Sequence, residues 1–228
     1  MHQIPVLLTA WRQLNGAAHP PENDHYGLSK LKQQLLRLGS MVEESAVLAR
    51  AVLAGPDMEA APLIRRGDDR IDQLYRQLEE RCAELLTKRP LSAGEVREVL
   101  SYLHCLRDLE RFGDYCKELA SLGEQLLPHQ PVMLRSELLT MLDRCCSLLA
   151  LALDCVSEED SSAGERLQAL DDLVDRDYER LLLQLTDSCS SAGCCRDQQL
   201  NLVLVLRCIE RMADHAVNVS QRVARREP

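Results

Sequence analysis

The fold is decided by the stretch Leu206-Arg207-Cys208-Ile209-Glu210-Arg211-Met212-Ala213-Asp214, which has a second version 100 residues earlier. The earlier version reads Leu106-Arg107-Asp108-Leu109-Glu110-Arg111-Phe112-Gly113-Asp114. In both, apolar residues recur at three- and four-residue spacing, which is typical of an amphipathic helix. A second motif agrees with this repetition, because Asp68, Asp72 and Tyr75 are matched by Asp171, Asp175 and Tyr178, 103 residues later. The shared order and the near-constant offset indicate an internal duplication.

Helical periodicity extends along most of the chain and is interrupted at a few turn signals. These signals are Pro20 to Asn23, Gly55-Pro56-Asp57, Arg89-Pro90, Pro128 to Pro131, Glu158 to Gly164 and Ser190 to Gly193. They predict six helices, at residues 27–54, 57–88, 92–127, 132–157, 164–189 and 194–226. Helices of up to about 45 Å must lie side by side in a bundle.

The predicted fold is all-α, with two tandem three-helix bundles related by an internal pseudo-twofold duplication. Residues 27–128 form the first repeat and residues 129–228 the second. Residues 1–26 are expected to be an irregular N-terminal extension. A sheet-rich fold is disfavoured because aromatic residues make up only 3% of the chain.

Charge and hydropathy exclude two classes of partner. The net charge of −9 makes a nucleic-acid phosphate backbone an unfavourable partner, and the basic run Arg222 to Arg226 is too short to reverse this. No segment has 18 consecutive apolar residues, so direct membrane insertion is not expected. The apolar segment Ile4 to Trp11 lacks a preceding basic region and is too short for an export signal.

Cysteine placement predicts a reducing, cytoplasmic location. The chain has ten cysteines. Five of them stand singly within apolar helical runs, where a reduced thiol behaves as a small hydrophobic side chain: Cys82, Cys105, Cys116, Cys155 and Cys208. A chain of 228 residues can bury a core without disulfides, and no Cys/His spacing fits tetrahedral zinc.

Four carboxylate pairs with a spacing of four residues are the candidate functional residues. They are Asp68/Asp72, Glu110/Asp114, Asp171/Asp175 and Glu210/Asp214. This spacing places two like charges on one helix face, which costs about 0.2 to 0.5 kcal/mol per pair. A hard divalent or trivalent cation would offset that cost, because it prefers oxygen ligands. At about 100° per residue the acids fall at the border of the apolar stripe, where they are half desolvated.

Other interpretations of the acidic pairs remain open. Arg111, Arg207 and Arg211 lie close enough in sequence to neutralise the acids as salt bridges, which would suit a metal-free helical interaction module. His104 and His215 border the acidic motifs and are further candidate ligands. A di-metal carboxylate enzyme is a third reading, although Glu-x-x-His occurs only once, from Glu22 to His25. We expect no enzymatic activity, since no phosphate loop or nucleophile motif is present.

The ordered motifs resemble the PhoU family of phosphate-signalling proteins. The resemblance rests on Glu110 to Tyr115 and Glu210 to Val219, with paired Glu-Arg-x-x-Asp signatures. Further matches are Gly39 to Glu43, Gly67 to Asp72, Lys88-Arg89-Pro90, and Asp171 to Asp175 with Tyr178. One departure is Leu91 to Arg97, where the family usually has a Pro-x-Ala-x-Asp-Leu-Arg stretch at the start of the third helix.

The resemblance implies a duplicated three-helix bundle, often dimeric, whose acidic motifs bind multinuclear clusters of metals such as Fe, Mn, Mg or Zn. It implies a cytoplasmic accessory of the phosphate-specific transporter that links the transporter ATPase PstB to the sensor histidine kinase PhoR. Such a protein represses the phosphate regulon when phosphate is plentiful. The metal ligands implied here are Asp68, Asp72, Glu110, Asp114, Asp171, Asp175, Glu210 and Asp214.

Overall fold

The computed structural model describes residues 24–55, 59–88, 90–126, 132–158, 164–188 and 196–224. In these residues it contains six α-helices and no strand: α2 (Asp24–Ala54), α3 (Ala60–Lys88), α4 (Ala93–Leu126), α5 (Val132–Glu158), α6 (Gly164–Ser188) and α7 (Arg196–Ala224). The all-α prediction is confirmed, and every helix end lies within three residues of its expected position. Residues 1–23, most of the expected N-terminal extension, lie outside the described residues.

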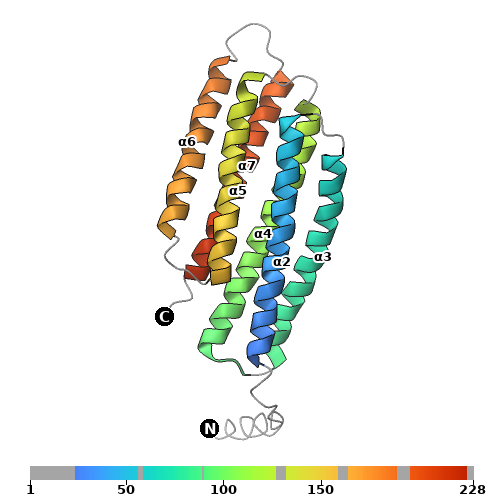
Figure 1. Cartoon of the computed structure of the whole chain (residues 1–228), viewed down its shortest axis with the longest axis vertical. Coiled ribbons are helices and arrows are strands. Elements are labelled where there is room, and N and C mark those ends of the chain that lie inside the picture. Colours follow the sequence, from blue (N-terminus) through green and yellow to red (C-terminus); the bar gives the residue numbers. More distant parts are fainter. Residues whose placement is uncertain are drawn as a thin grey trace, which may run out of the picture.

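The six helices form two groups of three that pack along their length (Figure 1). In the first half, α2, α3 and α4 contact one another, and in the second half α5, α6 and α7 do the same. The halves are joined by α4 against α7 and by α2 against α5. The outer helices α3 and α6 each contact only the other two helices of their own half. Four central helices therefore carry one outer helix on each side.

A single hydrophobic core runs through both halves. Its buried side chains come from all six helices and include Tyr102 and Phe112 of α4 and Met212 of α7. Polar contacts add to the junction, because the Ser101 hydroxyl donates a hydrogen bond to the carbonyl oxygen of Arg222 over 2.8 Å. The two repeats thus share their interior instead of forming separate cores.

Two local sequence features explain how the helices begin and approach each other. The Ser92 hydroxyl accepts a hydrogen bond from the Glu95 amide over 3.2 Å, and the Glu95 carboxylate accepts one from the Ser92 amide over 2.8 Å. This capping box starts α4. The stretch from Leu91 to Arg97, which departs from the usual family sequence, thus contains residues that start the helix. Gly39 of α2 allows a close approach to Leu153 of α5.

The cysteines reported for the described helices form no disulfide, and most of them are buried. All five that the sequence places in apolar runs are among the buried ones, which confirms that interpretation. Burial raises the pKa of the Cys82 thiol to about 11 and that of Cys208 to about 12. These thiols therefore stay protonated at neutral pH and act as core side chains. No described helix has the combination of length and apolar character needed to cross a membrane.

Candidate metal centres

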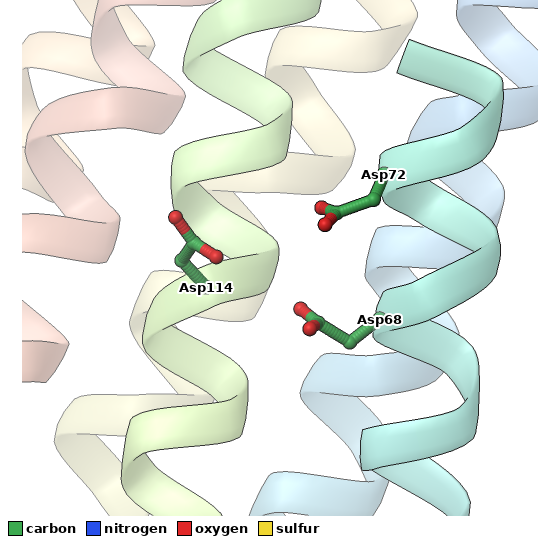
Figure 2. A group of neighbouring side chains, drawn as sticks. All are labelled: Asp68, Asp72 and Asp114. Carbon is green, nitrogen blue, oxygen red and sulfur yellow. The ribbon is translucent and has the colours of Figure 1, made fainter. Parts of the chain in front are cut away.

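The first acidic cluster lies between α3 and α4. Asp68 and Asp72 extend from α3 and Asp114 from α4, and Figure 2 shows the carboxylates of Asp68 and Asp72 directed toward α4, where Asp114 lies. One oxygen from each of the three lies within 4.8 Å of the other two. Among the described residues this is the only group of three or more His, Cys, Asp or Glu side chains that meets so closely. Asp68 is the most enclosed, with a side chain only 5% exposed.

Glu110, the fourth predicted ligand of this half, belongs to the same electrostatic environment. Burial raises its pKa, and the charges of Asp114, Asp72 and Asp68 raise it further. Burial and then the charge of Asp68 raise the pKa of Asp114 in the same way. Ionising Glu110 and Asp114 is therefore less favourable here than in water. The structure brings Asp68, Asp72 and Asp114 together with Glu110 nearby, while their role as metal ligands stays a prediction.

Three cationic side chains surround the first cluster. Lys117 of α4 donates a hydrogen bond to Asp68 across the helix interface. Arg111 lies 3.3 Å from Asp114 and 3.7 Å from Glu110. Arg76 lies 3.6 Å from Asp72. The salt-bridge interpretation of the acids therefore has structural support beside the metal interpretation.

The second acidic cluster occupies the matching place between α6 and α7. Burial, followed by the charges of Asp175 and Asp214, raises the pKa of Asp171 to about 6. Burial and the charge of Asp214 also raise the pKa of Asp175. Burial and then the charge of Asp214 raise the pKa of Glu210. The four carboxylates thus influence one another, although within the described part of the chain no three of their oxygens meet as closely as in the first cluster.

Arginines approach the second cluster as predicted. Arg211 lies 3.2 Å from Asp214 and 3.8 Å from Glu210, and Arg207 lies 3.3 Å from Glu210. Both arginines approach the same atom, Oε2 of Glu210, which is shielded from water and to which neither arginine donates a hydrogen bond. This carboxylate oxygen is therefore neutralised by nearby charge but not hydrogen-bonded.

A polar hollow of about 350 Å³ lies beside the second cluster. It is lined by side chains of α6 and α7, including Asp171, Asp214, Arg211 and Asn218. A site for a small hydrated cation needs both carboxylate oxygens and room for water ligands. The carboxylates of Asp171 and Asp214 and the polar hollow that they line together fit a hard divalent or trivalent ion.

The two histidines that flank the motifs differ in their surroundings. His215 lies 3.0 Å from Asp108, between Nδ1 and Oδ1, and its ring stacks on Tyr115 with centroids 5.9 Å apart. His104 is exposed on α4. The Glu22 to His25 motif cannot be placed, because Glu22 and the side chain of His25 lie outside the described residues.

Sequence reasoning missed two residues near the clusters, Lys117 and Asp108. Each breaks the repeat, since the residues 100 positions later are Val217 and Cys208. Comparing the two halves position by position would have singled both out. The sequence feature that could have identified Lys117 and Asp108 is therefore a difference between the two repeats and not a motif that they share.

Comparison with known proteins finds one family. The PhoU domain model matches residues 35–122 and 138–223, which include both acidic clusters. The phosphate-specific transport system accessory protein PhoU homolog of Synechocystis sp. is 34% identical over 206 residues, covering 90% of this chain and 92% of that protein. The crystal structure of PhoU from Pseudomonas aeruginosa has a TM-score of 0.83 at 28% identity, covering 87% of this chain and 96% of that one. PhoU from Streptococcus pneumoniae gives a TM-score of 0.82 at 27% identity, covering 90% and 96%.

Proposed function

Because this chain belongs to the PhoU family, we propose that it is a metal-binding regulatory adaptor of phosphate uptake. Its relatives are named as accessory proteins of the phosphate-specific transport system, which supports a regulatory and non-enzymatic role. The adaptor links the transporter ATPase PstB to the sensor histidine kinase PhoR and represses the phosphate regulon. It acts in the cytoplasm, as the resemblance to this family implies.

The observation that carries the metal part of the proposal is the pairing of acids across neighbouring helices. Asp68, Asp72, Glu110 and Asp114 hold ions between α3 and α4, and Asp171, Asp175, Glu210 and Asp214 hold them between α6 and α7. Fe, Mn, Mg and Zn are the candidate metals, with oxygen donors favouring the harder ions. A bound cation supplies positive charge that relieves the repulsion among the carboxylates, and so ties each outer helix to the central four.

The adaptor role is supported by the shape and charge of the chain. Four long central helices and two outer ones offer extended helix faces to protein partners (Figure 1). The net charge of −9 favours basic partner surfaces and opposes nucleic acid. We propose that the working form is a homodimer, as the resemblance to this family implies.

Titration of the metal-free protein tests metal binding directly. Mn²⁺, Mg²⁺ and Fe²⁺ are added to purified full-length protein and heat release is recorded. We expect saturable binding that is lost when Asp68, Asp114, Asp171 and Asp214 are all changed to Asn. The absence of saturable binding for each of these ions would contradict the metal-binding role.

Affinity purification from cells tests the adaptor role. Tagged protein is recovered from phosphate-replete and phosphate-starved cultures, and co-purified proteins are identified by mass spectrometry. We expect PstB and PhoR to be enriched over a control pull-down with the tag alone. If neither partner is recovered from either culture, the adaptor role is wrong.

One competing function is favoured by a specific observation. The ion pairs of Arg111 with Asp114 and of Arg211 with Asp214 are those expected of a metal-free interaction module. In that case the quadruple Asn variant would leave arginines unpaired and lose stability without any effect of added metal. Oxygen-dependent turnover of Fe²⁺ would instead support a di-metal carboxylate enzyme.

A further inference from the structure

The two acidic clusters differ in the positive charge that the protein itself supplies. We propose that Lys117 competes with metal at the first cluster, so that the second cluster fills with metal first. This inference rests on the proposed metal-binding function. It means that the two halves of the chain bind metal with unequal affinities, although they share the same acidic motif.

The position of Lys117 makes it a direct competitor. Its ammonium donates a hydrogen bond to the Oδ2 atom of Asp68, the most buried of the three clustered aspartates. Lys117 itself is 46% exposed, so its chain reaches inward from the surface of α4. A metal ion that uses the same oxygen must displace the ammonium, which can then return to water.

The ammonium interacts with the whole cluster and not with Asp68 alone. Lys117 contacts Asp68 directly, and one oxygen of Asp68 lies within 4.8 Å of oxygens of Asp72 and Asp114, so a cation on Asp68 stands next to all three carboxylates. A charge-assisted hydrogen bond is about twice as strong as a neutral one. Metal binding at the first cluster therefore has to overcome an interaction that is already favourable.

The second cluster has no equivalent of this lysine. The matching residue is Val217, which is buried and apolar. A second exchange acts in the same direction, because Arg76, which lies 3.6 Å from Asp72, is matched by the acidic residue Glu179. Arg111 and Arg211 contact their neighbouring acids in the same way. Arg207 adds an ion pair with Glu210 at the second cluster, 3.3 Å long, but this pair involves Glu210 and leaves Asp171, the counterpart of Asp68, without the kind of contact that Lys117 makes among the described residues.

The order of filling can be measured by nuclear magnetic resonance on the full-length protein. Substoichiometric Mn²⁺ is added to ¹⁵N-labelled, metal-free protein, and paramagnetic broadening of amide signals is followed. We expect signals around Asp171 and Asp214 to broaden before those around Asp68 and Asp114. Broadening of the first cluster before the second, or of both in parallel, would overturn the proposal.

Exchanging the two matched residues tests the role of Lys117 itself. In a background with Asp175→Asn and Asp214→Asn, which leaves the first cluster intact, Lys117→Val should tighten Mn²⁺ binding by roughly tenfold or more, the size expected when a charge-assisted hydrogen bond no longer competes. Lys117→Gln, which keeps a donor but removes the charge, should have most of this effect. Unchanged Mn²⁺ affinity in both variants would show that Lys117 does not compete.

The reciprocal change serves as the matched control. In a background with Asp72→Asn and Asp114→Asn, Val217→Lys should weaken Mn²⁺ binding at the second cluster by a similar factor. Circular dichroism tests whether each variant keeps its helices. If Val217→Lys fails to fold, the Lys117→Val and Lys117→Gln variants still test the proposal. Wild-type protein that binds no Mn²⁺ at either cluster would contradict the proposed function, whereas binding without dependence on Lys117 contradicts only this inference.

Discussion

Asp108 of α4 lies 3.0 Å from His215 of α7, measured between Oδ1 and Nδ1, and the contact joins the third helices of the two halves. The side chains are only 12% and 21% exposed. The pseudo-twofold relation gives this contact no counterpart, because Asp108 corresponds to Cys208 and His215 to Tyr115. The interface between the two similar halves therefore contains a polar contact that is not repeated at the symmetry-related position.

Removing the carboxylate of Asp108 should destabilise the protein. Asp108→Ala leaves the half-buried His215 without its partner, and losing a buried hydrogen-bond partner costs about 1 to 3 kcal/mol. Asp108→Asn retains an oxygen that can accept from the imidazole and should cost less. Urea unfolding followed by circular dichroism measures both. Equal unfolding midpoints for Asp108→Ala and the wild type would show that the contact contributes nothing.

The ion pair between Arg144 of α5 and Asp177 of α6 is a second polar contact that the other half of the chain does not repeat. Asp177 also contacts Arg180 over 3.2 Å. The matching residues of the first half are apolar, Met41 and Leu74. Changing only Arg144→Met should destabilise the protein by roughly 2 to 4 kcal/mol, because it leaves Asp177 with one fewer cation.

The double variant Arg144→Met with Asp177→Leu should recover most of that loss. It restores the apolar pair of the first half, and replacing a buried ion pair by hydrophobic residues is often neutral or stabilising. The free energy of unfolding of the single and double variants forms a double-mutant cycle. A double variant less stable than Arg144→Met would contradict this expectation.

Gly39 should not tolerate a methyl group. A Cβ there would lie 2.9 Å from Cδ1 and 3.2 Å from Cγ of Leu153, and closer still to Cδ2. Gly39→Ala should therefore destabilise the protein by about 1 to 3 kcal/mol through overpacking. Gly67→Ala is the control, since its Cβ meets only Ser45 at 3.6 Å and should gain about 0.5 to 1 kcal/mol from helix propensity. Thermal unfolding that ranks the two variants the other way would refute the packing argument.

The stability of the metal-free protein should depend on the ionisation of Asp171. Its pKa is raised to about 6, so the folded state binds this proton more tightly than the unfolded chain does. This contribution is present at low pH and is lost as the pH rises from about 4 to about 6. Allowing for partial exposure, it amounts to roughly 1 to 2 kcal/mol. The free energy of unfolding of Asp171→Asn and of the wild type, measured across this pH range, isolates the contribution of Asp171. If the two pH profiles run parallel, the ionisation of Asp171 does not affect stability.

Removing one acid from each cluster should lower metal content and keep the fold. Asp114→Ala with Asp214→Ala deletes one member of each pair and relieves like-charge repulsion on α4 and α7. We expect full helicity by circular dichroism and less bound metal by elemental analysis. Loss of helicity would instead identify the two aspartates as structural partners of Arg111 and Arg211.

The helices and the grouping of acids could be predicted because both follow from spacing along one chain. The stop at Arg89-Pro90 and the apolar periodicity fix α3 and α4 without knowledge of their neighbours. Asp68 and Asp72 share a face because four residues make about one turn. The duplicated order adds Glu110 and Asp114 to the candidate ligands, and their approach to Asp68 and Asp72 is a finding of the structure.

The contacts of Lys117, Asp108 and Asp177 could not be predicted in this way. Each contact depends on the axial offset between two packed helices, which the periodicity of a single helix does not specify. Asp108 and Asp177 also carry charges at positions that the pattern assigns to the interior, and only their partners on other helices make this favourable. The Gly39 contact likewise depends on how closely α2 approaches α5.

The interior shared by the two halves has a consequence for how this architecture can be divided. A fragment ending after α4 would expose to water the faces of α2 and α4 that now cover α5 and α7. Its best substitute for the missing half is a second copy of itself, so such a fragment should assemble in pairs in a concentration-dependent manner. In the full chain the two halves are covalently linked, so their association is intramolecular. Its folding therefore does not depend on protein concentration, unlike that of the paired fragments.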